Sequence, residues 1–129
     1  MQGNMKTILF SILILFSING FAFNWKKVSG NELGDLYVDV DNIKKRNGLV
    51  YYWILVENLE TTSNGVNSSI GKLKVDCVIE TATQLQTIFY SQSMGRGKIM
   101  TQVTSNEIVY PPPNSVLYGA MKFACENAK

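Results

Sequence analysis

The chain has 129 residues and a formal net charge of +2, from 12 basic and 10 acidic residues. This length predicts one domain. A net charge of only +2 produces a weak electrostatic field, which argues against nucleic acid or an anionic membrane as the partner. The 46% of hydrophobic residues excludes a disordered chain. The absence of histidine excludes Ser-His-Asp and Cys-His catalysis and histidine metal sites, and we expect no cofactor.

The first 22 residues have the pattern of a targeting segment. Lys6 precedes a nearly continuous apolar run over residues 8–16, and Gly20 and Ala22 place small residues at positions −3 and −1 of a cleavage site. The 15 residues from 8 to 22 fall short of the roughly 20 that a bilayer-spanning helix needs. We expect residues 1–22 to be a cleaved signal peptide and residues 23–129 one exported domain, periplasmic or at the cell surface, without stable membrane insertion. An uncleaved membrane anchor is the alternative.

Seven segments after the leader have the composition of β-strands. They are residues 23–28, 36–39, 49–56, 70–80, 83–90, 98–103 and 107–110. Turns are predicted at residues 29–31 and 34–35, and residues 41–46 read as a polar turn. Asn47-Gly48 is a hairpin signal, since both positions of a type I′ turn need φ > 0.

The strand over residues 49–56 is apolar on both faces. Tyr51 and Trp53 lie on one face and Tyr52 on the other, because strand side chains alternate. Both faces should therefore be covered, one by the core and the other by a folded part of the sheet or a second subunit.

The end of the chain predicts a helix. Three consecutive prolines over residues 111–113 end strand pairing, and Asn114 or Ser115 can cap a helix that starts at residue 116. Leu117, Met121 and Cys125 recur every four residues on one face of this helix. The sequence therefore predicts an α+β, mainly β domain, with about six antiparallel strands and a C-terminal helix packed on one sheet face.

The two cysteines are Cys77, predicted on the core face of a strand, and Cys125, on the docking face of the helix. In an exported chain such a pair predicts one disulfide, which would fasten the helix to the sheet. The alternative is two buried free thiols.

Basic residues form the one candidate binding patch, composed of Lys44, Lys45, Arg46, Lys72 and Lys74. Such a patch attracts an acidic partner or glycan. The alternative is ordinary solvated strand edges, where lysines discourage pairing.

Two further candidates have chemical precedent. Asp39, Asp41 and Asp76 are the carboxylates considered for glycosidic acid–base catalysis. The structural alternatives are that Asp39 and Asp41 brace the turn before Asn47-Gly48 and that Asp76 pairs with a lysine. The Gly-Arg-Gly-Lys segment at residues 95–98 can present amides and two cations to a phosphate or sulfate, or be a flexible basic turn.

The order of several short elements resembles the surface-adhesin protein E family. These elements are Trp25, Tyr37-Val38-Asp39, the stretch from Gly48 to Trp53, Asp76-Cys77, Pro113-Asn114-Ser115 and Cys125. The resemblance covers essentially the whole mature domain. It implies a C-terminal helix tied by the disulfide to the concave side of an antiparallel sheet. The named family member is a bacterial surface lipoprotein that binds host extracellular-matrix and plasma proteins and can dimerise. This chain lacks the lipidated cysteine, and the adhesive residues are not part of the shared pattern.

From these observations we expect an exported, non-enzymatic binding module, adhesin-like toward extracellular or envelope proteins, and able to form a homodimer. The alternatives are a periplasmic carboxylate-dependent hydrolase and an envelope structural protein.

Overall fold

The computed structural model describes residues 22–129. The predicted leader, apart from Ala22, lies outside the described residues, so its cleavage stays a prediction.

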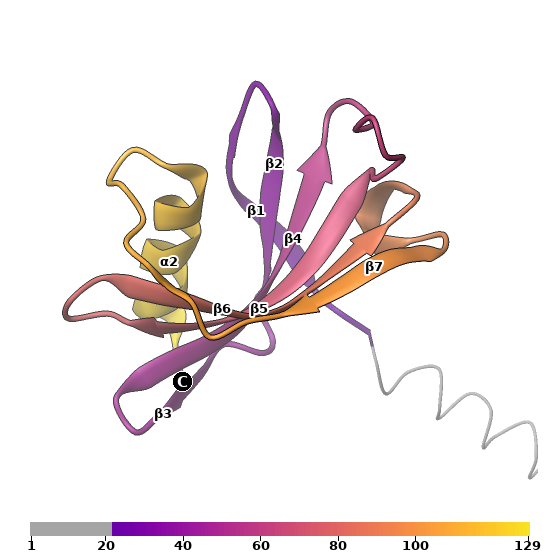
Figure 1. The fold of residues 1–129 in the computed structure, drawn as a ribbon. Helices are drawn as coiled ribbons and strands as arrows, with labels where there is room; N and C mark the ends of the chain where they lie inside the picture. Colours follow the sequence, from indigo (N-terminus) through magenta and orange to yellow (C-terminus); the bar gives the residue numbers. More distant parts are fainter. Residues whose placement is uncertain (1–21) are drawn as a thin grey trace, which may run out of the picture.

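An antiparallel sheet and one C-terminal helix make up the described domain (Figure 1). The strands are β1 (Trp25–Asn31), β2 (Gly34–Asp39), β3 (Lys44–Arg46), β4 (Leu49–Asn58), β5 (Ser68–Asp76), β6 (Thr81–Tyr90), β7 (Ile99–Thr104) and β8 (Ile108–Val109). The helix is α2 (Val116–Asn127), and a short 3₁₀ turn, η1 (Ser93–Gly95), precedes β7. This architecture confirms the predicted fold class.

Across the sheet the strand order is β1-β2-β4-β5-β6-β7. β3 pairs with β4 beyond the end of β2, and β8 pairs with β6 beyond the end of β7. The sheet thus has six strand positions, which we call lanes. β2 and β3 share one lane, and β7 and β8 share another. The predicted number of about six strands corresponds to these lanes. Lys44–Arg46, expected in a polar turn, instead form β3.

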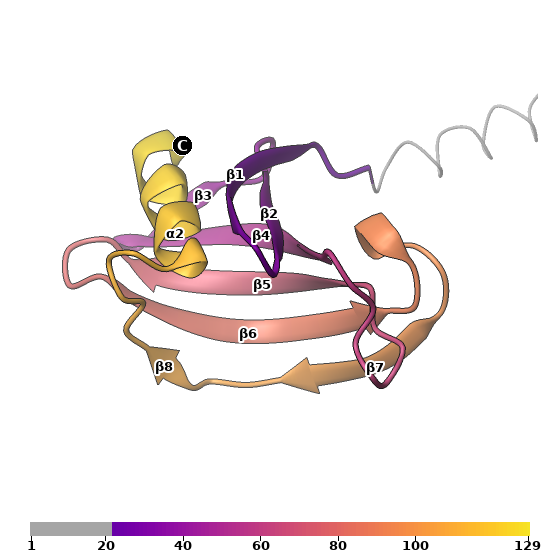
Figure 2. The same cartoon turned by 90° about the horizontal axis from the view of Figure 1, so that it is seen from above.

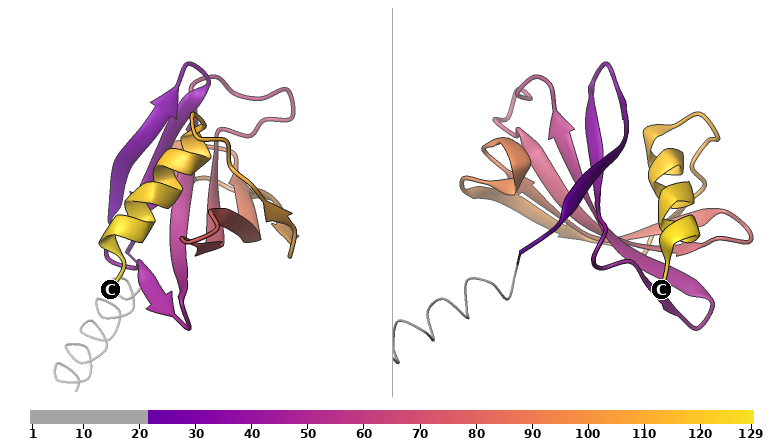
Figure 3. Two further views of the ribbon diagram at one scale, coloured as in Figure 1. Left: turned by 90° about the vertical axis from the view of Figure 1, so that its left-hand side faces the viewer. Right: turned by 180° about the vertical axis from the view of Figure 1, so that it is seen from behind.

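Helix α2 packs on one face of the sheet, which we call the helix face; the opposite one is the open face (Figures 2 and 3). Side chains from β2, β4, β5 and β6 form the floor of the core, and small residues of α2 allow the helix to approach closely. The fully buried members include Val38, Tyr52, Leu73, Val75, Ala82, Ala120, Met121 and Ala124.

The helix begins where the sequence predicts. The Ser115 hydroxyl accepts a hydrogen bond from the Tyr118 amide, which makes Ser115 the N-cap. A disulfide joins Cys77 and Cys125, whose Cα atoms lie 6.0 Å apart. The predicted bridge is confirmed, and the alternative of two free thiols is wrong.

The first chain reversal lies later than predicted. Residues 29–31, expected to turn, continue β1, and the chain reverses at Glu32 and Leu33, with Gly34 already in β2. The Asn31 side chain accepts hydrogen bonds from the amides of Leu33 and Gly34, which sets the reversal at that point.

β5 ends earlier than predicted. Residues 77–80 form a turn, because the Asp76 carboxylate accepts hydrogen bonds from the amides of Val78 and Ile79. Ile79, expected on the core face, is 64% exposed. Cys77 still reaches α2 from the first position of this turn.

The second apolar face of β4 is covered at one end only. Leu55 and Ile70 are buried beneath η1, where an added Cβ on Gly95 would lie 2.7 Å from Ile70 Cδ1. Toward the other end, Tyr51 and Trp53 are half-buried. The expected cover is therefore present at one end of the strand, and a second subunit over Tyr51 and Trp53 stays a prediction.

Candidate binding surface on the open face

Cationic and aromatic side chains come together on the open face of β3, β4 and β5. Cross-strand pairing places Lys44, Tyr51 and Lys74 in one row and Trp53 beside Lys72 in the next. Directly opposed residues of antiparallel strands point to the same face, so these side chains share one surface. We call it the basic–aromatic surface; its members are Lys44, Arg46, Tyr51, Trp53, Lys72 and Lys74.

A hollow of about 270 Å³ lies in this surface. Asn42 lines it together with side chains of the basic–aromatic surface. The Lys72 ammonium lies 5.6 Å from the centroid of the Trp53 ring, and the Arg46 guanidinium 6.0 Å from that of Tyr51. Cations at this range are attracted by the negative faces of the rings. The hollow thus combines positive charge with flat apolar walls.

The cations around the hollow have no carboxylate partner. Among residues 22–129 the one ion pair joins Lys27 to Asp35, at the β1 edge of the sheet. Lys44, Arg46 and Lys72 line the hollow, with Lys74 beside it, and within residues 22–129 none of the four forms an ion pair. Asp76, two residues after Lys74 in β5, is a carboxylate on the same face, and its oxygen accepts hydrogen bonds from the β5–β6 turn. Such local clustering of cations attracts a negatively charged ligand, with a strength that falls as salt is added.

The aromatic part of the surface extends toward the start of the domain. Phe23, 41% exposed, stacks on Trp25 with ring centroids 4.6 Å apart and meets Trp53 edge-on at 5.9 Å. The sequence predicts Trp25 in an edge strand and Trp53 in a core strand. It does not indicate their contact, which depends on the β1–β2 and β2–β4 registers.

Asp39 holds the first residues of the domain in place. Its buried carboxylate accepts hydrogen bonds from the Asn24 and Asp41 amides and from the Asn42 side chain. Asn24 also donates a side-chain hydrogen bond to Asp41. These contacts are the turn bracing considered for Asp39 and Asp41. Within residues 22–129 Asp76 does not form the expected ion pair with a lysine, because its carboxylate instead accepts hydrogen bonds from the β5–β6 turn. The Asp39 carboxylate has no exposed surface to offer a substrate.

One member of the predicted basic patch lies elsewhere. Lys45 pairs with Val50, whose side chain belongs to the helix-face core, so Lys45 points away from Lys44 and Arg46. The structure brings together the other four members, Lys44, Arg46, Lys72 and Lys74. Had residues 44–46 been predicted as a strand, the alternation of side chains would have placed Lys45 on the face opposite to Lys44 and Arg46.

Three amides of the 95–98 segment, those of Gly95, Arg96 and Lys98, already donate hydrogen bonds within the domain. Glu57 accepts a hydrogen bond from the Met94 amide, and Ser68 accepts one from the Gly95 amide. The Lys98 amide donates to the Ser91 hydroxyl. The segment is therefore a structural turn that covers the open face beside β5, rather than an empty cradle for an anion.

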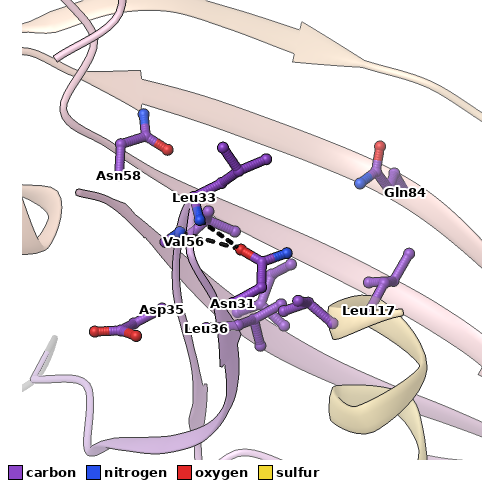
Figure 4. Close-up of a pocket in the computed structure, with 11 residues that line it drawn as sticks. Asn31, Leu33, Asp35, Leu36, Val56, Asn58, Gln84 and Leu117 are labelled. Atoms are coloured by element: carbon purple, nitrogen blue, oxygen red, sulfur yellow. Dashed lines mark hydrogen bonds between the residues drawn. The ribbon is translucent and has the colours of Figure 1, made fainter. Parts of the chain in front are cut away.

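The helix face has a hollow of different chemistry (Figure 4). It measures about 290 Å³ and lies between the β1–β2 hairpin, the sheet and the start of α2. Leu36, Ile54, Val56 and Leu117 give it apolar walls, with Gln84 on the far side. No lysine or arginine lines it. The basic–aromatic surface is therefore the part of the domain suited to an anionic partner.

Comparison with known proteins identifies the family. The family model described as surface-adhesin protein E matches residues 25–126. The chain belongs to the surface-adhesin protein E family. This membership confirms the resemblance read from the sequence and gives the chain a surface-adhesin type of role, with an exported or surface location. Within residues 22–129, no helix has the length and apolar character of a membrane span.

Solved structures of a protein E share the fold of this family member. One structure of Haemophilus influenzae protein E is 19% identical, with a TM-score of 0.59 over 83% of this chain and 87% of the other. A second crystal form of that protein is 17% identical, with a TM-score of 0.57 over 83% of this chain and 98% of the other. Among proteins with curated functions, none matches the chain.

Proposed function

We propose that this chain is an exported binding module of adhesin type that acts without catalysis. In this proposal the basic–aromatic surface contacts a negatively charged region of an extracellular or envelope protein. The observation that carries it is the group of four cations without acidic partners around half-buried rings. Aromatic residues and arginine are enriched in contact surfaces, and a cluster of positive charge steers the encounter with a negatively charged partner.

Binding measurements with purified extracellular-matrix, plasma and bacterial envelope proteins test the proposal. The variant Lys44→Gln/Lys72→Gln removes two charges from the surface, and we expect it to weaken binding about tenfold or more, or by about 1.4 kcal/mol. The matched control is Lys45→Gln/Lys122→Gln, because Lys45 points to the helix face and Lys122 is an exposed residue of α2. Binding to none of these proteins, or an equal loss in both variants, contradicts the proposal.

Export rests on the predicted leader. In the proposal residues 1–22 are removed and the domain acts in the periplasm or on the cell surface. Amino-terminal sequencing of the exported protein should start at Phe23, whereas a start at Met1 would mean an uncleaved anchor.

The proposal includes a homodimer formed through β7. β7 ends the sheet on one side, and all six of its residues are exposed. An unprotected edge of this kind offers free backbone groups to another strand.

A further inference from the structure

The arrangement of charges and rings on the basic–aromatic surface narrows the chemistry of the ligand. We infer that this surface binds a linear acidic polysaccharide, one that carries sulfate or uronate groups along its length. The inference rests on the proposed function and assigns the negative charge of the partner to a glycan chain.

The first argument is the layout of the surface in three parallel lanes. β3 and β5 supply the cations, and β4, between them, supplies the rings of Tyr51 and Trp53. Neighbouring strands lie about 4.8 Å apart, so the two cationic lanes are about 10 Å apart. Within one lane, residues two apart, such as Lys72 and Lys74, are separated by about 7 Å. The surface therefore holds a track with positive charge on both sides, which suits an extended chain with repeated anionic groups.

The second argument is the aromatic middle lane. The face of an aromatic ring is electronegative and attracts groups with partial positive charge. The C–H groups on the flat side of a sugar ring are such groups, and sulfate or uronate substituents at the ring edge would then reach the lysines on either side. Phe23 and Trp25 continue the aromatic area beyond Trp53.

The third argument separates a polysaccharide from an acidic peptide. A peptide that docks on a sheet gains most of its affinity by hydrogen bonding to a free edge. β4 is a central strand: residues 54–58 pair with β2 and residues 49–51 with β3 on one side, and residues 50–57 pair with β5 on the other. The face over Tyr51 and Trp53 thus offers side chains only, and a glycan needs no backbone partner. A hollow of about 270 Å³ is below the roughly 300–1,000 Å³ of pockets that enclose a small molecule, which favours a chain lying across it.

The test is a binding titration of the mature domain with four polymers: heparin, hyaluronan, poly-L-glutamate and neutral dextran. We expect binding to heparin and, more weakly, to hyaluronan, and no binding to dextran. Four cationic contacts predict a slope of about −3 in a plot of log affinity against log salt concentration. Lys44→Gln/Lys72→Gln should reduce the slope to about half and the affinity about tenfold, whereas Lys45→Gln/Lys122→Gln should leave both within twofold.

A further variant, Trp53→Leu, keeps every charge and removes the ring. It should weaken heparin binding several-fold and leave any weak binding of poly-L-glutamate unchanged, with folding checked by circular dichroism. Equal affinity for poly-L-glutamate and heparin, together with no effect of Trp53→Leu, overturns the glycan inference in favour of an acidic peptide. Failure to bind any polyanion overturns it as well. The proposed function survives both outcomes if a protein partner is bound and lost in Lys44→Gln/Lys72→Gln.

Discussion

At the scale of single residues, two tyrosine hydroxyls differ in their hydrogen bonding, and each contributes to the stability of the domain. Tyr52 is fully buried, and within residues 22–129 its hydroxyl has no hydrogen-bond partner. Tyr118, in α2, donates a hydrogen bond of 2.6 Å to a Glu80 carboxylate oxygen. Burial raises the pKa of Tyr52 far above its ordinary value, and the hydrogen bond to Glu80 raises the pKa of Tyr118.

Replacing the two tyrosines by phenylalanine should change stability in opposite directions at pH 7. Tyr52→Phe removes an unsatisfied buried hydroxyl, and we expect the free energy of unfolding to rise by about 1 kcal/mol. Tyr118→Phe removes a hydrogen bond to a carboxylate, so the same quantity should fall. Chemical denaturation at pH 7 measures both. A clear destabilisation by Tyr52→Phe would mean that the hydroxyl has a partner.

The pH dependence follows from the same raised pKa values. Below the unfolded pKa of about 10, a tyrosine whose pKa is higher in the folded state is protonated in both states, and its titration does not change the stability. Above pH 10 the stability falls as the unfolded chain ionises, by up to about 1.4 kcal/mol per pH unit for Tyr52. The wild type should therefore lose stability between pH 10 and 12 more steeply than Tyr52→Phe. If the stability of the wild type and of Tyr52→Phe falls equally between pH 10 and 12, ionisation of Tyr52 is not the cause of the loss.

Substituting two glycines with positive φ by alanine should separate the free-energy cost of backbone strain from that of overpacking. Gly48 has φ +79° and open space around its α-carbon, whereas Gly95 has φ +69° and lies against Ile70. We expect Gly48→Ala to cost about 1 kcal/mol, the cost of the left-handed conformation. Gly95→Ala should cost about 1–3 kcal/mol more, because the added methyl group overpacks the buried layer under η1. Equal losses in thermal or chemical denaturation would mean that η1 moves aside freely.

At the scale of elements, the disulfide and the helix belong together. Cys77 and Cys125 are 48 residues apart, and α2 covers the floor of the core with Ala120, Met121 and Ala124. In the chain-entropy model a loop of this length contributes about 4 kcal/mol to stability. That is a large share of the 5–15 kcal/mol typical of a whole domain.

Removal of the disulfide should therefore release the helix before the sheet. We expect Cys77→Ser/Cys125→Ser to lose about 4 kcal/mol of unfolding free energy, with hydrogen exchange rising first in α2. The basic–aromatic surface is on the opposite face and is built from β3, β4 and β5, so polyanion binding should persist in any folded fraction. Undisturbed exchange in α2 of the reduced protein would show that packing alone holds the helix.

At the scale of the whole molecule, the two edges of the sheet differ in how they are protected. β1 carries Lys26 and Lys27 and has a bulge between Lys27 and Ser29. Charges and bulges are the usual devices against edge-to-edge pairing. β7 has neither a charge nor a proline, and it exposes Ile99 and Val103.

β7 is also complementary to a second copy of itself. An antiparallel pair centred on Thr101 would place Ile99 opposite Val103 twice, around a two-fold axis and with no like charges in contact. We expect a concentration-dependent dimer in analytical ultracentrifugation, and Val103→Lys should shift it to monomer. Val78→Lys is the matched control, since Val78 is 89% exposed in the β5–β6 turn, away from this edge. A wild-type monomer at high concentration would contradict the proposed homodimer.

Local sequence features were sufficient for much of this domain. The apolar run of β-forming residues over 49–56, the Asn47-Gly48 signal and the four-residue spacing of Leu117, Met121 and Cys125 depend on neighbours in the chain. Each predicts an element that the structure contains. The disulfide followed from the cysteine pair of an exported chain, and the lack of histidine excluded whole classes of catalysis without any coordinates.

Only the tertiary structure decided which face of the sheet receives the helix and which stays open. Alternation assigns Tyr51 and Trp53 to one side of β4 and Tyr52 to the other, but burial of a side depends on pairing between strands distant in sequence. The same non-local register separates Lys45 from Lys44 and brings Lys72 beside Trp53. A binding surface made from three strands depends on how those strands pair. The sequence therefore identified the cationic and aromatic residues but did not predict which of them lie side by side.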